Sequence, residues 1–431
     1  MKKIYLFTIV AALFFTSSGF AQDITNNIRK ITVEEAVQLA KENSSSLKQA
    51  KLDLDLAKKK KDYSWNSASP SLTVAASFGG GATGSYDAWS NGNQLEKDPK
   101  FDASATLKIN LTSNLYTSIQ SQNISYEQAL ISYENTVRAL DKDIRTKFYS
   151  CVLNKESFII KQNELKQIKQ IYESNKVKYN LGQKSELDLL QSQYNYEYKL
   201  LEVDDSKRKL ETEFETFKEE LGINISENIE LDYNLDEAAK IVITEESVMV
   251  NIDETSEIRN LELDVANKKN NLLKDRFNYF GPSISASAMA TLDDLSFNYS
   301  LGVSIPLDGF LPWSEKALNV ATTKRDLEKK EVSLEERKTE LAKEIVKSYK
   351  EIQVSKTKLE MLDKNILLAQ KKYDMTLDAY NHGSRNLMDL QDSSDSLIKA
   401  KNERQSQIFS LIKLILDLEY KLGLPYGTLG K

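Results

Sequence analysis

The sequence predicts a mainly α-helical protein with a small transmembrane β part, built from a duplicated unit of helix, β-hairpin and helical hairpin. Three observations lead to this fold class. The 431 residues include only 6 prolines and 15 glycines, well below the usual shares of about 5% and 7%. The glycines that interrupt the helical stretches recur at one constant spacing, and four short segments alternate apolar with polar residues. Long helices, an internal repeat and a few strands are therefore expected.

The composition also excludes several classes of function. A single cysteine, Cys151, rules out a disulfide framework and a cysteine-based zinc site. A single histidine, His382, removes the usual imidazole chemistry; we interpret these two as a helix-packing and a surface residue. Because no nucleophile–base set is visible, we expect no enzyme, no cofactor and no metal site. Charged residues make up 28% of the chain and its net charge is −6, which disfavours a multi-span helical membrane protein and nucleic-acid binding.

Residues 1–21 have the pattern of an export signal peptide. Lys2 and Lys3 precede an apolar run at 4–15, and small residues lead to Ala21, where cleavage would follow. The alternative is a retained N-terminal anchor, but the apolar run is short for a bilayer span. We therefore expect the mature protein to leave the cytoplasm.

The first repeat is expected at residues 22–222, with strands at about 71–79 and 101–111. In the second of these strands the odd positions are apolar and the even positions polar. Each segment is close to the ~9–11 residues that a tilted strand needs to cross an outer membrane. The residues between them, 79–100, are rich in glycine and polar side chains and suit an external loop. Alternating strands also build soluble sheets, but no further element is left to cover one here.

A long helical hairpin is expected to follow at about 113–221. No proline occurs between Pro99 and Pro282, and the glycines of the hairpin are Gly182 at its centre and Gly222 at its end. Glycine is the residue that most often ends a helix. We therefore place the tip of the hairpin at Gly182.

The same pattern returns after a linker region at 223–256. The second repeat, residues 257–431, is expected to hold strands at about 283–292 and 295–305, a helical hairpin at about 313–422, and a short C-terminal tail. Gly383 and Gly423 lie 201 residues after the two glycines of the first hairpin. The same offset relates Tyr172 to Tyr373, Tyr179 to Tyr380, Asn180 to Asn381, Asp188 to Asp389 and Leu189 to Leu390. These matches indicate an internal duplication.

Four strands cannot close a membrane barrel, since closed barrels have about eight or more, and open edges are not viable in lipid. The chain must therefore oligomerise, with 8, 12 or 16 strands for two, three or four copies. The residues alone do not choose between these numbers.

The order of elements resembles the TolC-like outer membrane efflux protein family (outer membrane factors) across essentially the whole mature chain. Residues 31–40 look like its opening helix. Ser69-Pro70-Ser71-Leu72 and Gly281-Pro282-Ser283-Ile284 look like its strand entries, and Gly182 and Gly383, each followed by an Asp-Leu pair, look like its tip turns. Ser45 departs from the family, where a proline is common.

The resemblance implies a homotrimer whose 12-stranded β-barrel in the outer membrane continues into a 12-helix α-barrel tunnel through the periplasm. It implies a channel that exports substrates delivered by a periplasmic adaptor (membrane fusion) protein and an inner-membrane pump, in multidrug or toxic-compound efflux or type I secretion. The region 223–256 would join the tail and residues 31–47 in an equatorial girdle. The remaining alternative is an exported periplasmic coiled-coil scaffold without a pore.

By motif position, the acidic gate that the family has at the periplasmic tip corresponds to Asp389 and Asp392. These residues lie three positions apart and so on one helix face. Helix capping is an equally good explanation for Asp389, because Asn386 and Asp389 have capping-box spacing. Capping does not explain Asp392, which lies beyond the first turn.

The family also holds its tip closed through polar links between hairpins. By motif position these would be Tyr380 and Arg385, reaching toward Asp188 and its neighbour Leu187 in the other hairpin. Gly182 and Gly383 would form the hairpin turns, around which an adaptor would dock. These residues do not determine whether the transported substrate is a drug, a metal or a protein.

Overall fold

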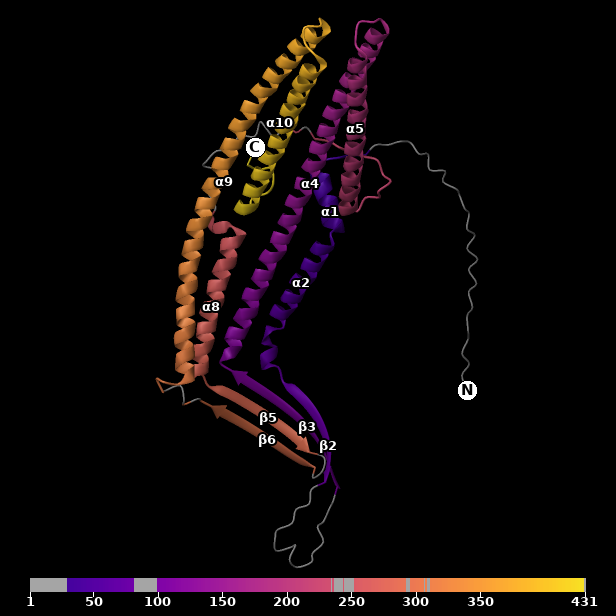
Figure 1. Ribbon diagram of the computed structural model, residues 1–431. Helices are drawn as coiled ribbons and strands as arrows, with labels where there is room; N and C mark the ends of the chain where they lie inside the picture. Colours follow the sequence, from indigo (N-terminus) through magenta and orange to yellow (C-terminus); the bar gives the residue numbers. More distant parts are fainter. Residues whose placement is uncertain are drawn as a thin grey trace, which may run out of the picture.

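The computed structural model is mainly helical and elongated, with four strands at one end and the tips of two helical hairpins at the other (Figure 1). It describes residues 29–80, 99–233, 235, 243, 252–291, 295–305, 307 and 311–429. The expected export signal at 1–21 lies outside the described residues, as do most of the expected loop at 79–100 and much of the expected linker at 223–256. The predicted mainly α-helical class is confirmed.

Two helices run most of the length of the molecule. α4 (Asn114–Asn180) and α9 (Glu315–Asn381) each have 67 residues, which corresponds to about 100 Å at 1.5 Å per residue. Each turns back into a helix of 36 residues, α5 (Glu186–Leu221) after α4 and α10 (Leu387–Leu422) after α9. The two hairpins therefore match in length as well as in sequence position.

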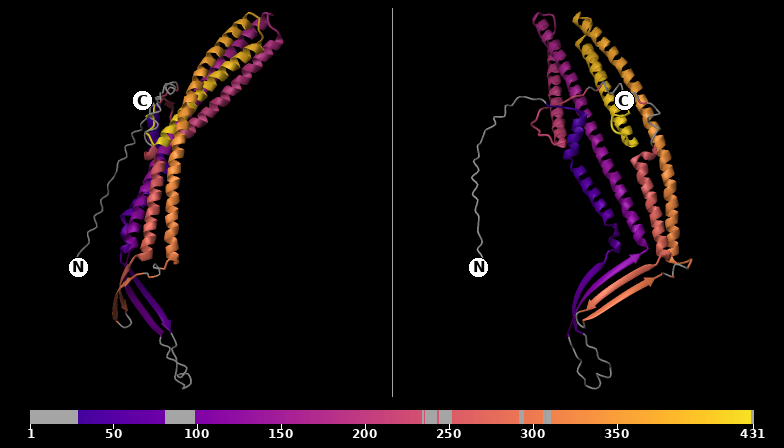
Figure 2. Two further views of the ribbon diagram at one scale, coloured as in Figure 1. Left: turned by 90° about the vertical axis from the view of Figure 1, so that its left-hand side faces the viewer. Right: turned by 180° about the vertical axis from the view of Figure 1, so that it is seen from behind.

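Shorter helices complete the half of the molecule nearest the strands. α2 (Ser45–Asp62) packs against α4, and α8 (Ser256–Phe280) packs between α4 and α9. α2 lies in line with α5, and α8 lies in line with α10 (Figure 2). The helices thus form one curved layer, in the order α5, α4, α10 and α9 near the tips, and α2, α4, α8 and α9 near the strands. Among the described residues, no helix combines the length and the apolar character needed to cross a membrane.

The four long strands form one antiparallel sheet in the order β2, β3, β5 and β6. Their bounds are Ser71–Gly80, Pro99–Thr112, Ser283–Thr291 and Ser296–Ser304. The register brings apolar residues together on one face, for example Leu72 opposite Leu107. The other face pairs small hydroxyl side chains, such as Ser287 with Ser300, whose oxygens are 2.8 Å apart. This alternation follows from the period of two in each strand.

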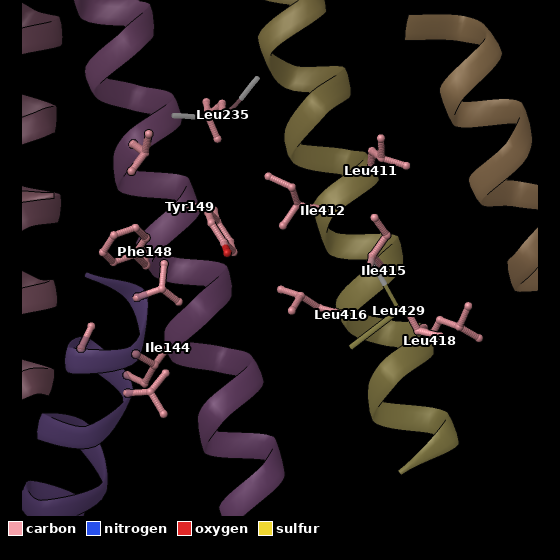
Figure 3. Close-up of a cluster of buried hydrophobic side chains, with 14 of the residues drawn as sticks. Ile144, Phe148, Tyr149, Leu235, Leu411, Ile412, Ile415, Leu416, Leu418 and Leu429 are labelled. Carbon is pink, nitrogen blue, oxygen red and sulfur yellow. The ribbon is translucent and has the colours of Figure 1, made fainter. Parts of the chain in front are cut away.

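The main hydrophobic core lies at mid-length, where the hairpins meet the shorter helices. Tyr149 of α4 points toward α10, where Ile412 and Leu416 lie opposite (Figure 3). Phe148 lies on the other side of α4 (Figure 3), and its ring centre is 6.2 Å from that of Phe217 on α5. α1 (Val33–Asn43) covers this core, and a short parallel pair forms between β1 (Arg29–Ile31) and β4 (Ile229–Leu231).

The end of the chain is tied to the same region. Glu419 on α10 is 1% exposed and accepts hydrogen bonds from the backbone N–H groups of Thr428 and Leu429, at 2.9 and 3.1 Å. Burial raises the pKa of the Glu419 carboxyl, although these N–H donors favour its charged form. The carboxylate therefore holds the tail against α10, and none of the described cations forms an ion pair with it.

Candidate functional site

The two hairpin tips have the same backbone design. Gly182 and Gly383 have φ angles of +72° and +76°, a region that L-residues with a Cβ atom avoid. The N–H of each glycine donates to the carbonyl of Tyr179 or Tyr380, and the next N–H donates one residue further back. This pattern is the Schellman motif, which satisfies the last carbonyl groups of the long helix.

The acidic residue that follows each turn has a different role in the two tips. In the first tip, the Ser185 hydroxyl accepts from the N–H of Asp188 at 3.1 Å, and the Asp188 carboxylate accepts from the Ser185 backbone at 3.4 Å. In the second tip, Asn386 Oδ1 accepts from the N–H of Asp389 at 2.8 Å, but the Asp389 carboxylate does not complete the box. Asp188 therefore caps its helix, while the charge of Asp389 is left for other contacts.

Arg385 forms an ion pair with the Asp389 carboxylate. Its Nη1 atom lies 3.6 Å from Oδ2 of Asp389, one helical turn away in the same hairpin. The expected pairing of Arg385 with Asp188 is not found among the contacts of the described residues: Arg385 lies beside Asp389, and Oδ2 of Asp188 accepts from the Ser185 hydroxyl at 2.8 Å. Both members of the observed pair are partly exposed, so the pair itself contributes little to stability.

Tyr380 makes a contact between the hairpins close to their tips. Its ring is 4% exposed, and its hydroxyl donates to Oδ1 of Asn175 on α4 at 2.7 Å. The Nζ atom of Lys184, in the first turn, lies 4.8 Å from the centre of the same ring. Burial raises the pKa of Tyr380, and the negative charge of Asp188 raises it further. Tyr380 thus reaches the other hairpin at Asn175 and Lys184, and Asp188 acts on it only through its charge.

Sequence reasoning missed Asn175, although its position carries a signal. Ile168, Ile171 and Asn175 follow the 4- and 3-residue steps of an apolar helix stripe, so a polar residue there is out of pattern. Asn175 is 0% exposed. Its carboxamide nitrogen makes no hydrogen bond with the described residues, and the Tyr380 hydroxyl is therefore its one direct partner.

A buried ionic cluster lies deeper between the hairpins. Glu164 on α4 is 3% exposed, and Lys199 on α5 places its Nζ atom 2.9 Å from Glu164 and 2.7 Å from Glu202. Burial raises the pKa of Glu164, and the negative charges of Asp395 on α10 and of Glu202 add to the shift, whereas Lys199 opposes it. The ion pairs join α4 and α5 within the first hairpin, and Asp395 of the second hairpin acts on Glu164 through its negative charge.

The second acidic residue of the expected gate lies beside lysines. Asp389 and Asp392 line a groove between α9 and α10 together with Lys371, Lys372 and Arg385. Asp392 is exposed, and Asp389 is half-buried. Positive and negative side chains therefore share this groove in the single chain.

The two remaining chemically reactive side chains have structural roles. Burial raises the pKa of the Cys151 thiol to about 12, so the thiol stays protonated and packs inside the core. His382 is exposed, and its Nδ1 atom lies 2.8 Å from the carbonyl of Asp378. In the part of the chain that the structure describes, no group of His, Cys, Asp and Glu side chains is arranged to hold a metal ion.

Large apolar side chains remain exposed along both edges of the helical layer. On α5 they follow helical spacing: Leu187, Leu190, Tyr194, Tyr198 and Leu201, 55–73% exposed. On α9 they recur every seven residues: Val354, Met361, Leu368 and Met375, 63–68% exposed. Neither stripe is covered by the described part of its own chain. A heptad-spaced stripe is the pattern of a helix that packs against another helix.

Comparison with known proteins places these features in a family. The model of the family described as "Outer membrane efflux protein" matches residues 36–222 and 260–406. The comparison with curated proteins gives no match.

Several solved structures share the fold. One is CusC, described as forming a transmembrane channel, with a TM-score of 0.76 and 14% identity over 91% of this chain and 92% of that chain. Another is the CmeC outer membrane channel of Campylobacter jejuni, with a TM-score of 0.69 and 16% identity over 91% of this chain and 85% of that chain. The MtrE outer membrane channel of Neisseria gonorrhoeae, in its open state, has a TM-score of 0.71 and 16% identity, over 91% of this chain and 89% of that chain.

At these identities the structures establish a common fold, and the family model establishes the membership. The match covers most of both repeats, including both tips and all four strands of the long sheet. It confirms the resemblance that the duplicated motifs indicate. The chain belongs to the outer membrane efflux protein family, a family of outer-membrane transport channels and not of enzymes.

Proposed function

We propose that three copies of this chain form a channel-tunnel that exports substrates across the outer membrane. The observation that carries the proposal is incompleteness: the sheet has two open edges, and the helical layer has two exposed apolar stripes. Closing both at once requires further copies of the chain arranged head to tail in a ring. The number three comes from the family resemblance.

The two edges of the helical layer are complementary in charge as well as in apolar character. Residues 186–221, which form α5, carry a net charge of −6, and residues 343–381, the facing half of α9, carry +2. At the equatorial level, four lysines and one glutamate line a groove on α9: Lys343, Lys347, Lys350, Lys358 and Glu351. Three glutamates and two lysines line a groove on the opposite edge: Glu211, Glu215, Glu230, Lys155 and Lys218. Opposite charges on two such surfaces favour one relative register of the copies.

The sheet supports the same closure. In the described sheet, β2 and β6 each pair on one side only, and unpaired backbone groups are costly in lipid. Pairing β6 of one copy with β2 of the next would satisfy them. Three copies would place 12 strands in the outer membrane, with the apolar face toward lipid and the hydroxyl-rich face toward the lumen.

Gating is proposed at the periplasmic tip. In a ring, Asp389 and Asp392 from three copies would place six carboxylates around the axis, which favours cations. Tyr380, through Asn175 and Lys184, is the proposed latch that holds the second hairpin against the first. In this scheme Arg385 acts by orienting Asp389, and Asp188 acts by fixing the first turn beside Tyr380.

The proposed partners are a periplasmic adaptor protein and an inner-membrane pump. The two turns at Gly182 and Gly383 end the molecule and expose apolar side chains, including Leu181 and Leu187, 66% and 73% exposed. Exposed apolar groups at a loop tip are suited to docking a partner helix. The adaptor would bind around these turns.

The whole proposal is tested on the purified full-length protein. We expect a heat-modifiable trimer in the outer-membrane fraction that gives discrete conductance steps in planar bilayers. A monomeric or soluble periplasmic protein without conductance would instead establish the alternative, a coiled-coil scaffold without a pore.

The gate is tested by replacing Asp389 and Asp392 with alanine. We expect weaker block by divalent cations and altered cation selectivity in bilayers, with trimer assembly unchanged. A matched control, Asp374→Ala with Asp378→Ala, removes two exposed carboxylates from α9 at the same height. Equal block in the gate variant and the control would contradict the proposal.

A further inference from the structure

The helices meet the strands in a region that is strongly basic. We call this region the basic collar and define it as residues 58–62, 114–124, 274–280 and 313–320, where α2, α4, α8 and α9 end beside the sheet (Figure 1). The collar contains seven basic and three acidic side chains, a net charge of +4, while the whole chain carries −6. The positive charge is therefore concentrated at one level of an acidic protein.

Three consecutive lysines at the end of α2 dominate the collar. Lys58, Lys59 and Lys60 are all exposed, and none of them forms an ion pair with another described residue. Because an α-helix turns 100° per residue, three consecutive side chains cover about 200° of its circumference. The first turns of α4, at 114–124, contain no charged residue that could neutralise them.

The fourth lysine of the run is engaged within the chain. Lys61 is half-buried, and its Nζ atom lies 4.5 Å from the centre of the Tyr126 ring on α4. This cation–π contact fixes the end of α2 against α4. It leaves the ammonium groups of Lys58, Lys59 and Lys60 directed to the surroundings of the protein.

Four exposed aromatic side chains lie at the same level of the molecule as the lysines. Tyr63, Trp65, Tyr116 and Trp313 are 59%, 53%, 61% and 81% exposed. Trp65 precedes the first residue of β2, Ser71, by six positions. Exposed tryptophan and tyrosine beside lysine, next to an apolar strand face, is the composition of a segment at a lipid–water interface.

We propose that the basic collar binds the anionic headgroups of phospholipids in the periplasmic leaflet of the outer membrane. The proposal rests on the proposed function, which places the sheet across that membrane. The lysine ammonium groups would donate hydrogen bonds to the phosphodiester oxygens. The apolar face of the sheet continues directly from the collar, so the acyl chains would lie along it. One lipid would therefore contact the collar with its headgroup and the sheet with its acyl chains.

The test measures which lipid lies beside Trp65. In the full-length trimer, Trp89→Phe with Trp313→Phe leaves Trp65 as the only tryptophan, since the chain has three. This protein is reconstituted into vesicles of four parts phosphatidylethanolamine to one part phosphatidylglycerol, in which one or the other lipid is brominated. Bromine quenches tryptophan fluorescence at short range, so the ratio of the two quenching levels gives the local lipid preference.

We expect brominated phosphatidylglycerol to quench Trp65 well beyond its share of the bilayer, and the excess to fall as NaCl screens the charges. A lysine near an anionic surface contributes about fivefold to binding. Lys59→Gln with Lys60→Gln is therefore expected to reduce the preference by up to about 30-fold. The matched control, Lys48→Gln with Lys51→Gln, removes two exposed lysines from the same helix, farther from the strands, and is expected to retain the preference.

Quenching by each lipid in proportion to its share of the bilayer in the parent protein, with normal conductance, would overturn the lipid proposal and leave the channel intact. Absence of quenching by either lipid, together with absence of conductance, would overturn the proposed function itself. Dissociation of the trimer by Lys59→Gln with Lys60→Gln, with no change in lipid preference, would assign the lysines to the contact between copies and also overturn the proposal.

Discussion

The returning helices α5 and α10 occupy equivalent places in the two repeats, but their surroundings differ. Both have 36 residues and end in a glycine with positive φ. α10 contributes 13 buried residues, whereas α5 contributes four. The cause is position: α10 packs along its length between α9 and α4, whereas α5 packs along α4 only and meets the short helix α1.

The sequences of the two helices differ in line with this difference in burial. Ile408 and Ile412 of α10 are 0% and 5% exposed, and the positions 201 residues earlier are Lys207 and Glu211. The duplication therefore supplied the same backbone twice, while the identity of each side chain follows from which faces are covered within the chain. The exposed face of α5 is the part that, in our proposal, awaits the next copy.

The largest expected effect is on the free energy of unfolding, and it should differ between equivalent regions of α10 and α5. Leu390 of α10 is 1% exposed, and Leu190 of α5 is 55% exposed. We expect Leu390→Ala to lower the free energy of unfolding by about 2–5 kcal/mol, because it leaves a cavity. Leu190→Ala should cost less than about 0.5 kcal/mol in the single chain and should instead weaken the trimer. Urea unfolding followed by circular dichroism and native mass spectrometry measures both; equal unfolding losses would remove the distinction.

The second prediction concerns the contact between hairpins. Tyr380→Phe removes the donor to Asn175 and leaves a buried carbonyl oxygen unsatisfied, at a cost of about 1–3 kcal/mol. If the contact holds the closed state, the ratio of open to closed channels should rise about 5- to 150-fold. Single-channel recording measures this ratio. The matched control is Tyr179→Phe, whose side chain is 38% exposed, and a comparable rise in that variant would argue against the latch.

A smaller effect should distinguish the two acidic residues after the tip turns. Asp188→Ala removes a carboxylate from a complete capping box, and we expect a loss of about 1 kcal/mol. Asp389→Ala removes only an exposed pair with Arg385, and we expect a loss below about 0.5 kcal/mol. Thermal unfolding of the two variants side by side checks the order. The reverse order would mean that Asp389 is the structural residue.

Arg385→Ala tests whether the ion pair at the second tip affects channel closure. It frees the Asp389 carboxylate from its only ion pair in the described tip. We expect a modest rise in resting conductance with no measurable loss of stability, as judged by bilayer recording beside thermal unfolding. An unaltered closed state would show that Arg385 has no part in the latch.

The smallest predicted effect is a pH dependence from the cluster around Glu164. Its pKa is raised above the ordinary 4.5, so the folded state binds the proton more tightly than the unfolded state. Its contribution therefore opposes folding above the raised pKa and disappears as the pH falls below 4.5. The groups facing Glu164 are Lys199 and Glu202 on α5 and Asp395 on α10.

Acidification from pH 7 toward pH 5 should accordingly strengthen the contact between the hairpins, and Glu164→Gln should flatten this part of the profile. Lowering the pH also acts on other carboxylates, so the difference between parent and variant is the quantity measured. Parallel profiles would mean that Glu164 stays charged throughout the range.

Much of the architecture was predictable because the breaking residues are few and repeated. The positions of Gly182 and Gly383 fix the tips, since helices of this length end where the backbone needs positive φ. The capping spacing at Asp188 and Asp389 was also visible, but which of the two completes a capping box was not. Ser185 offers a hydroxyl oxygen as acceptor and Asn386 offers a carboxamide oxygen. The conformation of the folded turn then decides whether the carboxylate of Asp188 or Asp389 reaches back to the backbone N–H of the capping residue.

The sequence by itself determined the helical hairpins, the four alternating strands, the duplication and the incompleteness of the single chain. These follow from local chemistry: breaker positions, the periods of 3.6 and two, and the number of strands. The tertiary structure decided that Tyr380 bonds to Asn175, that Arg385 bonds to Asp389, and that α10 is central while α5 is at the edge. The Tyr380–Asn175 pairing joins residues 205 positions apart, and no local pattern encodes which face of one helix meets which face of another.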